Sequence, residues 1–210
     1  MSSPAHPWLY FLVVLGVIVL PGMDMAFVLA SALVGGRRAG LAAVGGIVTG
    51  GFCHVAMGVA GIATLLAVAP AAFNTLLLAG AAYIAWIGIS LLRSGAALSA
   101  AASAAPSPAR CFRQAVATSL LNPKAYVFML AVFPQFLRPS AGPIAGQAVV
   151  LSAITAATQA VVYGGVALLA ASTRGWLEAH PSGSAALGRA VGVLLVLAAV
   201  LTGVQGWRGA

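Results

Sequence analysis

Two short runs of the sequence combine a proline with an ionisable side chain inside an otherwise apolar stretch. They are Pro21-Gly22-Met23-Asp24 and Asn122-Pro123-Lys124. Proline lacks a backbone N–H and clashes with the preceding turn, so each run predicts a break in a helix. If the helix crosses a membrane, the carbonyls freed by the break need partners from the protein, from water or from a ligand, because lipid supplies none. Both runs therefore indicate places where polar groups can meet a solute within a membrane.

Asn122-Pro123 predicts that a new half-helix begins at this point. Asn is a favoured N-cap residue and Pro a favoured first helical residue. Lys124 then falls in the first turn, where its ammonium adds to the positive end of the helix dipole. Such a site attracts anions, and a substrate carboxylate is an obvious ligand.

Asp24 is the only acid within any expected membrane span. A charge at the bilayer centre costs about 2.5–3.5 kcal/mol on insertion scales, so such a residue usually faces the interior and has a function. Asp24 could bind a substrate ammonium, carry a coupling proton or pair with Lys124. A purely structural Asp24–Lys124 pair is the alternative, and the readings are compatible. Gln159, the most interior glutamine, is a further candidate for lining a pathway.

Three glycines and a histidine recur at intervals of four residues in the second apolar stretch. They are Gly46, Gly50, His54 and Gly58. Residues at this spacing share one face of a helix, and small residues there let helices approach closely. We expect this face to pack against another helix, with His54 bonded to a neighbouring backbone group. A proton relay through His54 is the alternative.

The composition is that of a membrane protein. Of the 210 residues, 62% are hydrophobic and only 6% are charged, whereas soluble domains carry about 25% charged residues. A membrane span needs about 20 apolar residues. Six stretches meet that need, roughly at residues 8–34, 41–67, 72–92, 114–136, 147–170 and 190–207. We therefore predict an all-α integral membrane fold with six transmembrane helices.

A flexible linker at 94–113, rich in Ala, Ser and Pro, divides a single membrane domain into halves of three helices each, 1–93 and 114–210. An odd number of helices per half gives the halves opposite orientations, and inverted repeats are common in secondary transporters. Pro21 and Pro123 lie at similar depth in helices 1 and 4, so we expect both helices to be broken at Pro near the midplane.

The basic residues predict the orientation. With the N-terminus outside, seven arginines fall in cytoplasmic loops and two fall outside, in agreement with the positive-inside rule. The seven are Arg37, Arg38, Arg93, Arg110, Arg113, Arg174 and Arg189, and the two are Arg138 and Arg208. We expect a multi-pass protein of the cell (inner or plasma) membrane with both termini outside the cytoplasm. Aromatic residues near the expected membrane edges are typical of an interfacial belt: Trp8, Tyr10, Trp176 and Trp207.

Other function classes lack the residues they need. Scattered basic residues build no nucleic-acid-binding face, Cys53 and Cys111 form no CxxC motif, and the phosphate loop of an ATP-driven pump is absent. We find no enzyme constellation and expect no cofactor and no metal site. A metal or inorganic-ion exporter is the alternative function, although His6, His54 and His180 are scattered, whereas metal transport needs clustered ligands.

Three segments occur in a characteristic order and spacing along the chain. They are PGMDMAFVLASALVGGRRAGLAAVGGIVTG at 21–50, LAGAAYIAWIGISLLRS at 78–94 and LLNPKAYVFMLAVFPQF at 120–136, of which the third is the most specific. Over nearly its whole length the chain resembles the LysE/RhtB family of amino-acid exporters. The positions matching the family motifs are Pro21, Gly22, Asp24, Asn122, Pro123 and Lys124. Met23 replaces the second proline of the usual Pro-Gly-Pro.

The resemblance implies proton-coupled export of amino acids or derivatives from the cytoplasm by secondary active transport. The family's usual substrates are lysine or arginine in one branch and homoserine, homoserine lactone, threonine or other neutral amino acids in another. Because the expected spans hold one acid, we favour neutral substrates. We expect Asp24, Lys124, Asn122 and Gln159 to bind the substrate or the proton. The glycine faces can pack helices within one chain or between two chains, so a homo-oligomer is one of the expected possibilities.

Overall fold

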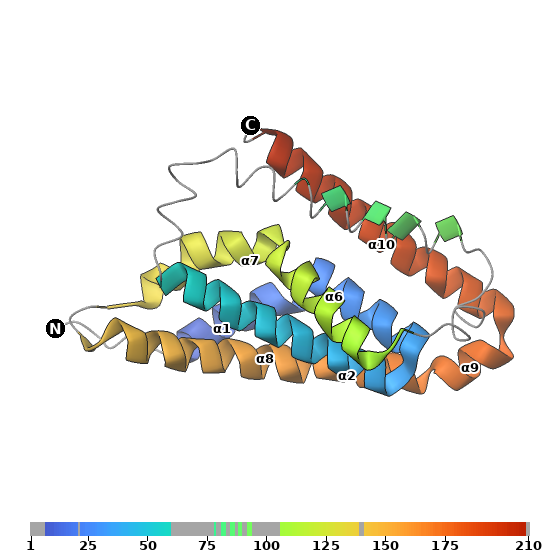
Figure 1. The fold of residues 1–210 in the computed structure, drawn as a ribbon, viewed down its shortest axis with the longest axis horizontal. Coiled ribbons are helices and arrows are strands. Elements are labelled where there is room, and N and C mark those ends of the chain that lie inside the picture. Colours follow the sequence, from blue (N-terminus) through green and yellow to red (C-terminus); the bar gives the residue numbers. More distant parts are fainter. Residues whose placement is uncertain are drawn as a thin grey trace.

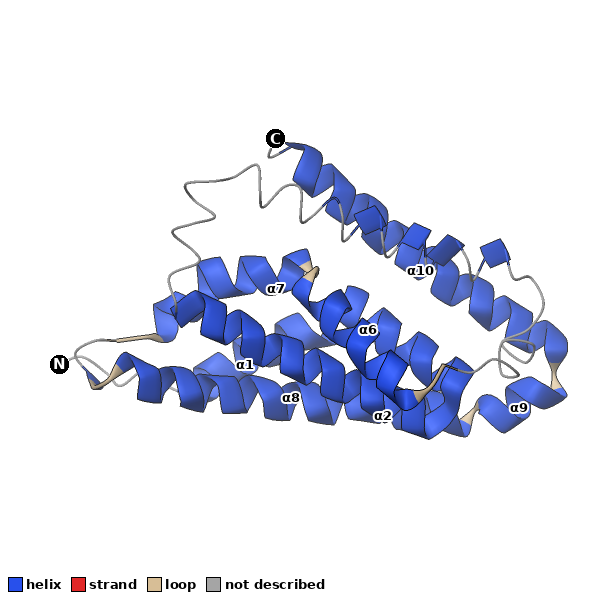
Figure 2. Cartoon of the chain, viewed as in Figure 1, coloured by secondary structure: helices blue, strands red, loops and turns tan. Residues whose placement is uncertain are grey.

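Helices make up the described part of the chain. The computed structural model describes residues 7–20, 22–59, 78, 81–82, 85–86, 88–89, 92–93, 106–138 and 141–208. Among these residues no strand occurs (Figure 1, Figure 2), which confirms the all-α class. Pro21, most of the segment 60–92 and the linker residues 94–105 lie outside the described residues.

Among the described residues, nine helical segments have defined bounds. They are α1 (Pro7–Val19), α2 (Met23–Val59), α6 (Pro108–Leu120), α7 (Pro123–Val127), the π-helix η1 (Phe128–Val132), the 3₁₀-helix η2 (Phe133–Phe136), α8 (Ile144–Ser172), α9 (Arg174–Ala179) and α10 (Pro181–Arg208). α6 begins inside the expected linker, because Ser107 caps it and Pro108 follows in the first turn. The interval 171–189, which lies between the last two expected spans, is helical for most of its length.

α2 is two helices joined at Gly36. Gly36 has φ 69° and ψ −166°, a left-handed conformation that glycine adopts without a steric penalty. A Cβ atom added to Gly40 would lie 3.2 Å from Cα of Ala32, although eight residues of straight helix rise about 12 Å. The chain therefore turns back on itself at Gly36, and the two arms, Met23–Gly35 and 37–59, lie side by side.

Glycines on the second arm of α2 receive α6. A Cβ atom at Gly46 would collide with the backbone carbonyl of Phe112, and one at Gly50 would collide with the side chain of Ser119. Side chains at these positions would push the two helices apart. The predicted close packing is confirmed, and it occurs within one chain.

Large apolar side chains on α1, α8 and α10 face outward. Those more than half exposed include Trp8, Val19, Val149, Val161, Leu169, Leu197 and Val200. Continuous apolar surface of this kind suits lipid as its surroundings, whereas water would disfavour it. Tyr10 is an exception to the predicted interfacial belt, because it is fully buried at 0% exposure while Trp8 is 60% exposed.

Two helices of the described part are long and apolar enough to cross a membrane, Met23–Gly58 and Ile144–Ser172, and Pro7–Val19 is a shorter apolar helix. The Gly36 turn divides the first of these into two arms. The six-helix arrangement and its inverted halves therefore stay predictions.

Helix 1 and helix 4 of the prediction are both interrupted. α1 ends at Val19, and helical structure resumes at Met23 beyond Gly22. α6 ends at Leu120, and α7 begins at Pro123. The breaks expected from the sequence are therefore present, although the placement of Pro21 itself is outside the described residues.

Basic segments gather at one end of the bundle. A Cβ atom at Gly35 would lie 3.8 Å from the carbonyl oxygen of Pro106, so the Gly36 turn and the start of α6 are neighbours. Arg37, Arg38, Arg110 and Arg113 belong to these two segments. α9 lies at the same end, and the starts of α1 and α8 lie at the opposite end (Figure 1).

Candidate functional site

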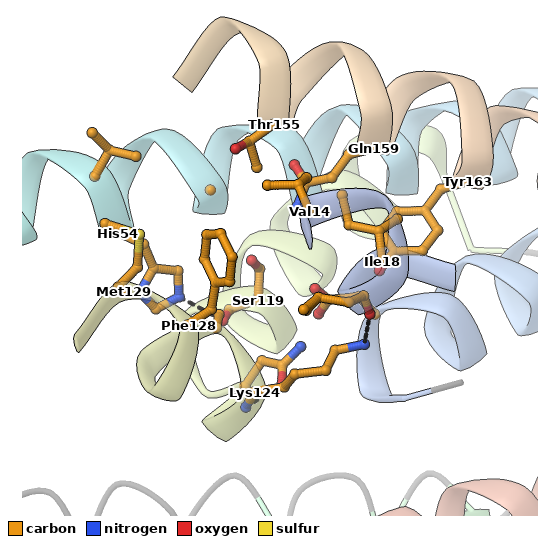
Figure 3. Close-up of a pocket in the computed structure, with 16 residues that line it drawn as sticks. Val14, Ile18, His54, Ser119, Lys124, Phe128, Met129, Thr155, Gln159 and Tyr163 are labelled. Atoms are coloured by element: carbon orange, nitrogen blue, oxygen red, sulfur yellow. Dashed lines mark hydrogen bonds between the residues drawn. The ribbon is translucent and has the colours of Figure 1, made fainter. Parts of the chain in front are cut away.

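A cavity of about 60 Å³ lies between α1, both arms of α2, α6, α7, η1 and α8 (Figure 3). Its polar lining is supplied by Asp24, His54, Ser119, Asn122, Lys124, Thr155, Gln159 and Tyr163. The four residues that the sequence nominated for binding, from three different parts of the chain, therefore face one cavity. The turn at Gly36 adds Gly51, His54 and Val55 to the same cavity, because it returns the second arm of α2 to the level of Asp24.

Three buried polar atoms at this cavity have no hydrogen-bond partner among the described residues. They are Asp24 Oδ1, Asn122 Nδ2 and Gln159 Oε1, on side chains exposed by 4%, 2% and 8%. A buried polar atom without a partner costs about 1–3 kcal/mol. Native structures hold few such atoms, and each calls for an explanation such as a ligand. Here three of them, two acceptors and one donor, share one small space.

Lys124 supplies hydrogen bonds to backbone carbonyls that the break in helix 1 leaves without helical donors. Its Nζ donates to the carbonyl oxygens of Val17 and Leu20, both at 3.0 Å. These carbonyls lost their helical donors where α1 ends, so the ammonium replaces backbone N–H groups. An ammonium has three hydrogens, so one remains beyond these two bonds to the described residues. A Cβ atom at Gly22 would lie 3.1 Å from Nζ, so a glycine leaves room for this approach.

The Asp24 carboxylate and the Lys124 ammonium attract each other, and the Asn122 amide lies near the carboxylate at a geometry that leaves its Nδ2 without a hydrogen bond. The hydrogen bonds of the ammonium nevertheless go to the backbone of α1. The Asp24–Lys124 relation is therefore a Coulombic attraction across the cavity, while Lys124 is anchored elsewhere.

Asn122 begins α7 in the predicted way. Its side-chain Oδ1 accepts a hydrogen bond of 3.0 Å from the Lys124 backbone N–H, with Pro123 in the first turn. Because Oδ1 is used for this cap, Nδ2 is the end of the amide that faces the cavity. α7 continues into the π-helix η1 after five residues.

His54 packs against the backbone as expected. Its Nε2 lies 2.9 Å from the carbonyl oxygen of Ser119, and its ring stands edge-on to Tyr126 at 4.6 Å between centroids. A carbonyl oxygen only accepts, so Nε2 carries the proton and donates. The bond joins the second arm of α2 to α6 beside the cavity. A proton relay through His54 stays a prediction.

Sequence reasoning missed Thr155 and Tyr163, which line the same cavity. A signal was present, because Thr155, Gln159 and Tyr163 recur at intervals of four and share one face of α8. It was hidden because threonine and tyrosine are common in apolar helices for packing.

A desolvated polar cavity, enclosed by interrupted apolar helices whose outer faces suit lipid, is typical of a membrane transporter. The chain matches the family described as LysE type translocator over residues 15–206. It therefore belongs to the LysE-type translocators, and it is a membrane protein.

Curated relatives agree with this assignment. The chain is 34% identical over 182 residues to a homoserine/homoserine lactone efflux protein of Salmonella typhimurium, covering 86% of this chain and 87% of the relative. It is 36% identical to an uncharacterized membrane protein of Vibrio cholerae, covering 79% and 82%. It is 33% identical over 127 residues to a leucine efflux protein of Klebsiella pneumoniae, covering 58% of each. No solved structure matches the chain.

Proposed function

We propose that this protein exports a small neutral amino acid or amino-acid derivative from the cytoplasm, by secondary active transport coupled to protons. The observation that carries the proposal is the set of unpaired polar atoms at the central cavity: Asp24 Oδ1, Asn122 Nδ2 and Gln159 Oε1, with the spare hydrogen of Lys124. Relatives named for efflux of homoserine, homoserine lactone and leucine give independent support.

The unpaired atoms complement an amino-acid zwitterion. A substrate ammonium needs acceptors, and Asp24 Oδ1 and Gln159 Oε1 are acceptors. A substrate carboxylate needs donors, which Asn122 Nδ2 and the third Lys124 hydrogen provide. Binding would thus give each orphaned atom a partner and recover the free energy that burial cost.

The rest of the lining favours an uncharged substrate side chain. Val14, Ile18, Val55, Phe128 and Met129 form an apolar wall around the polar groups. The only other acid in the sequence is Glu178, in α9 at the basic end of the bundle. A dibasic amino acid would bring a second ammonium to a cavity whose lining holds a single carboxylate, and an unpaired buried charge is strongly unfavourable.

Asp24 is also the proposed carrier of the coupling proton. A carboxylate in a dry cavity is more stable when a proton or a substrate ammonium neutralises it. Competition between the two for one carboxylate would tie the exit of substrate to the entry of a proton. This exchange needs the carboxylate to face each side of the membrane in turn.

We further propose that the protein sits in the cell membrane as two inverted three-helix halves with both termini outside the cytoplasm. Support comes from the basic segments at one end, Arg37 and Arg38 beside Arg110 and Arg113. Positive charge accumulates on the cytoplasmic side of membrane proteins. The opposite end carries the starts of α1 and α8.

The test is export from cells loaded through peptides with labelled threonine, homoserine, leucine, lysine or arginine. Faster efflux of neutral amino acids that collapses with a protonophore is the expected result. Asp24→Asn keeps the size of the side chain and removes its charge, so we expect it to reduce export at least about 100-fold while the protein still reaches the membrane. Glu178→Gln is the matched control and should export normally. Wild-type export by Asp24→Asn would remove Asp24 from the mechanism.

The metal-exporter alternative gains no support. Among the described residues no group of three or more His, Cys, Asp or Glu side chains could hold a metal ion. A deletion strain whose growth defect depended on a metal, with no change in amino-acid efflux, would restore it.

A further inference from the structure

A second hollow, of about 310 Å³, lies at the end of the bundle that carries the start of α1 and α8. Its lining includes Pro7, Phe136, Gln147 and Leu151. The central cavity meets α8 at Thr155, one turn beyond Leu151, which is a rise of about 6 Å. The two spaces therefore follow each other along α8, and a layer of packed side chains separates them.

Tyr10 is the centre of that layer. Its ring contacts Phe128, which lines the central cavity, at 6.0 Å between centroids, and Phe136, which lines the outer hollow, at 5.0 Å. Phe133 closes the cluster at 6.2 Å. Tyr10 is 0% exposed, so it is covered from both spaces.

One hydrogen bond holds Tyr10 in this position. Its hydroxyl lies 2.8 Å from Thr155 Oγ1. Thr155 donates its only hydroxyl hydrogen to the Leu151 carbonyl oxygen at 3.0 Å. Tyr10 must therefore be the donor to Thr155. The bond ties α1 to α8 at the boundary between the two spaces.

All three phenylalanines lie on the irregular part of helix 4. Phe128 begins the π-helix η1, and Phe133 and Phe136 are the ends of the 3₁₀-helix η2. π- and 3₁₀-segments have weaker backbone hydrogen bonding than an α-helix and often mark hinges at functional sites. The side of the layer opposite Tyr10 is thus carried by the segment best able to change its helical form.

We propose that Tyr10 is the gate between the central cavity and an exit vestibule formed by the outer hollow, and that this structure has the gate closed. Opening separates the Tyr10 ring from Phe128 and Phe136 through a change in η1 and η2, and it breaks the bond to Thr155. The substrate then passes from the cavity to the vestibule. The identity of the substrate in this inference rests on the proposed export function. The position of the path rests only on the two spaces and the residues between them.

The test measures access to the cavity and needs no substrate. Val14→Cys, in a protein with Cys53→Ala and Cys111→Ala, places a thiol in the cavity wall one turn from Tyr10. A charged, membrane-impermeant methanethiosulfonate is applied to intact cells and to inverted vesicles. Ala141→Cys, which is exposed at the outer hollow, identifies the side on which the vestibule opens.

Labelling of Val14→Cys from the vestibule side should be slow with Tyr10 intact. Tyr10→Phe removes the Tyr10–Thr155 hydrogen bond, and Thr155→Val removes that bond together with the one that Thr155 donates to Leu151. Because the Tyr10–Thr155 bond is the one they share, each should speed labelling about fivefold, and the double variant no further. Tyr10→Ala should speed labelling at least tenfold, because it also removes the ring. The labelling rate should then approach that of a thiol with an unobstructed path from the vestibule. Phe11→Ala, which changes an aromatic residue exposed on the outer face, is the matched control and should leave the rate unchanged.

Unchanged labelling in Tyr10→Phe, Thr155→Val and Tyr10→Ala would overturn the gate. So would equal acceleration from the opposite membrane side, or acceleration in Phe11→Ala. If Tyr10→Ala fails to reach the membrane, the two single hydrogen-bond variants decide the matter. Accelerated labelling without export of any amino acid in the panel would keep the gate and reject the proposed substrate class.

Discussion

The breaks in helix 1 and helix 4 look alike in sequence and are completed differently. The helix 4 break is closed by its own residues, because Asn122 caps the backbone N–H of Lys124 two positions later. The helix 1 break is closed from a distance, because its carbonyls at Val17 and Leu20 accept hydrogen bonds from Lys124, 107 and 104 residues away. The helix 4 break is closed by local hydrogen bonding, and the helix 1 break is closed only when two distant parts of the chain have met.

Because of this difference, we expect Lys124→Met to cause the largest loss of stability. Methionine keeps the length of the side chain, removes both hydrogen bonds and leaves Asp24 without its nearby positive charge. We expect a loss of about 3–5 kcal/mol of stability, as when one partner of a buried charged group is removed, and loss of export. Thermal unfolding in detergent measures the first effect. Lys124→Arg retains donors and should lose less, and equal unfolding of Lys124→Met and wild type would show that helix 1 does not depend on Lys124.

A smaller effect is expected from Gly22→Ala. Its Cβ would lie 3.1 Å from Lys124 Nζ, so the ammonium must shift by a few tenths of an ångström and lengthen its bonds to α1. We expect a loss of about 1–2 kcal/mol, typical of overpacking at a fixed site. Gly16→Ala in the same helix is the matched control, because nothing lies within 4 Å of its added Cβ. Gly16→Ala should be neutral or stabilising, and a similar loss in both variants would contradict the explanation.

The smallest effect is expected at the self-contained break. Asn122→Ala removes the cap of α7, which costs about 1 kcal/mol, and leaves the hydrogen bonds of Lys124 to α1 intact. Asn122→Ser restores a capping oxygen and should recover most of the stability. Neither should restore full export, because both lack the amide donor that we place at the substrate carboxylate. Full export by Asn122→Ser would assign Asn122 to capping alone.

The features predicted from the sequence are those with local chemical causes. The helix start at Asn122-Pro123 follows from the capping preferences of two adjacent residues. The approach of α6 to Gly46 and Gly50 follows from a four-residue spacing that any helix turns into a face. The meeting of the candidate polar residues at one cavity is less directly predictable. It follows from the high free-energy cost of a buried polar group that has no hydrogen-bond partner.

The features that were not predicted depend on groups that sequence patterns do not reveal. Every residue has a backbone carbonyl, so the sequence does not reveal which carbonyls accept a side-chain hydrogen bond. Nothing in the sequence near Val17 or Leu20 therefore predicted that Lys124 would bind there. Tyr10 was assigned to the interfacial belt because it is aromatic and lies near an expected membrane edge, yet it is buried because η1 and η2 place three phenylalanines around it. The bulk and polarity of Tyr10 suit either position, and only the fold decides between them.

The long reach of Lys124 has a consequence for biosynthesis. Ribosomes add about 5–20 residues per second, so the Leu20 carbonyl waits roughly 5–20 s before its donor, 104 residues later, is even made. During that interval the break after α1 lacks the hydrogen bonds that Lys124 later donates. The break after α1 is therefore closed late in synthesis, when the Lys124 ammonium of α7 reaches the Val17 and Leu20 carbonyls.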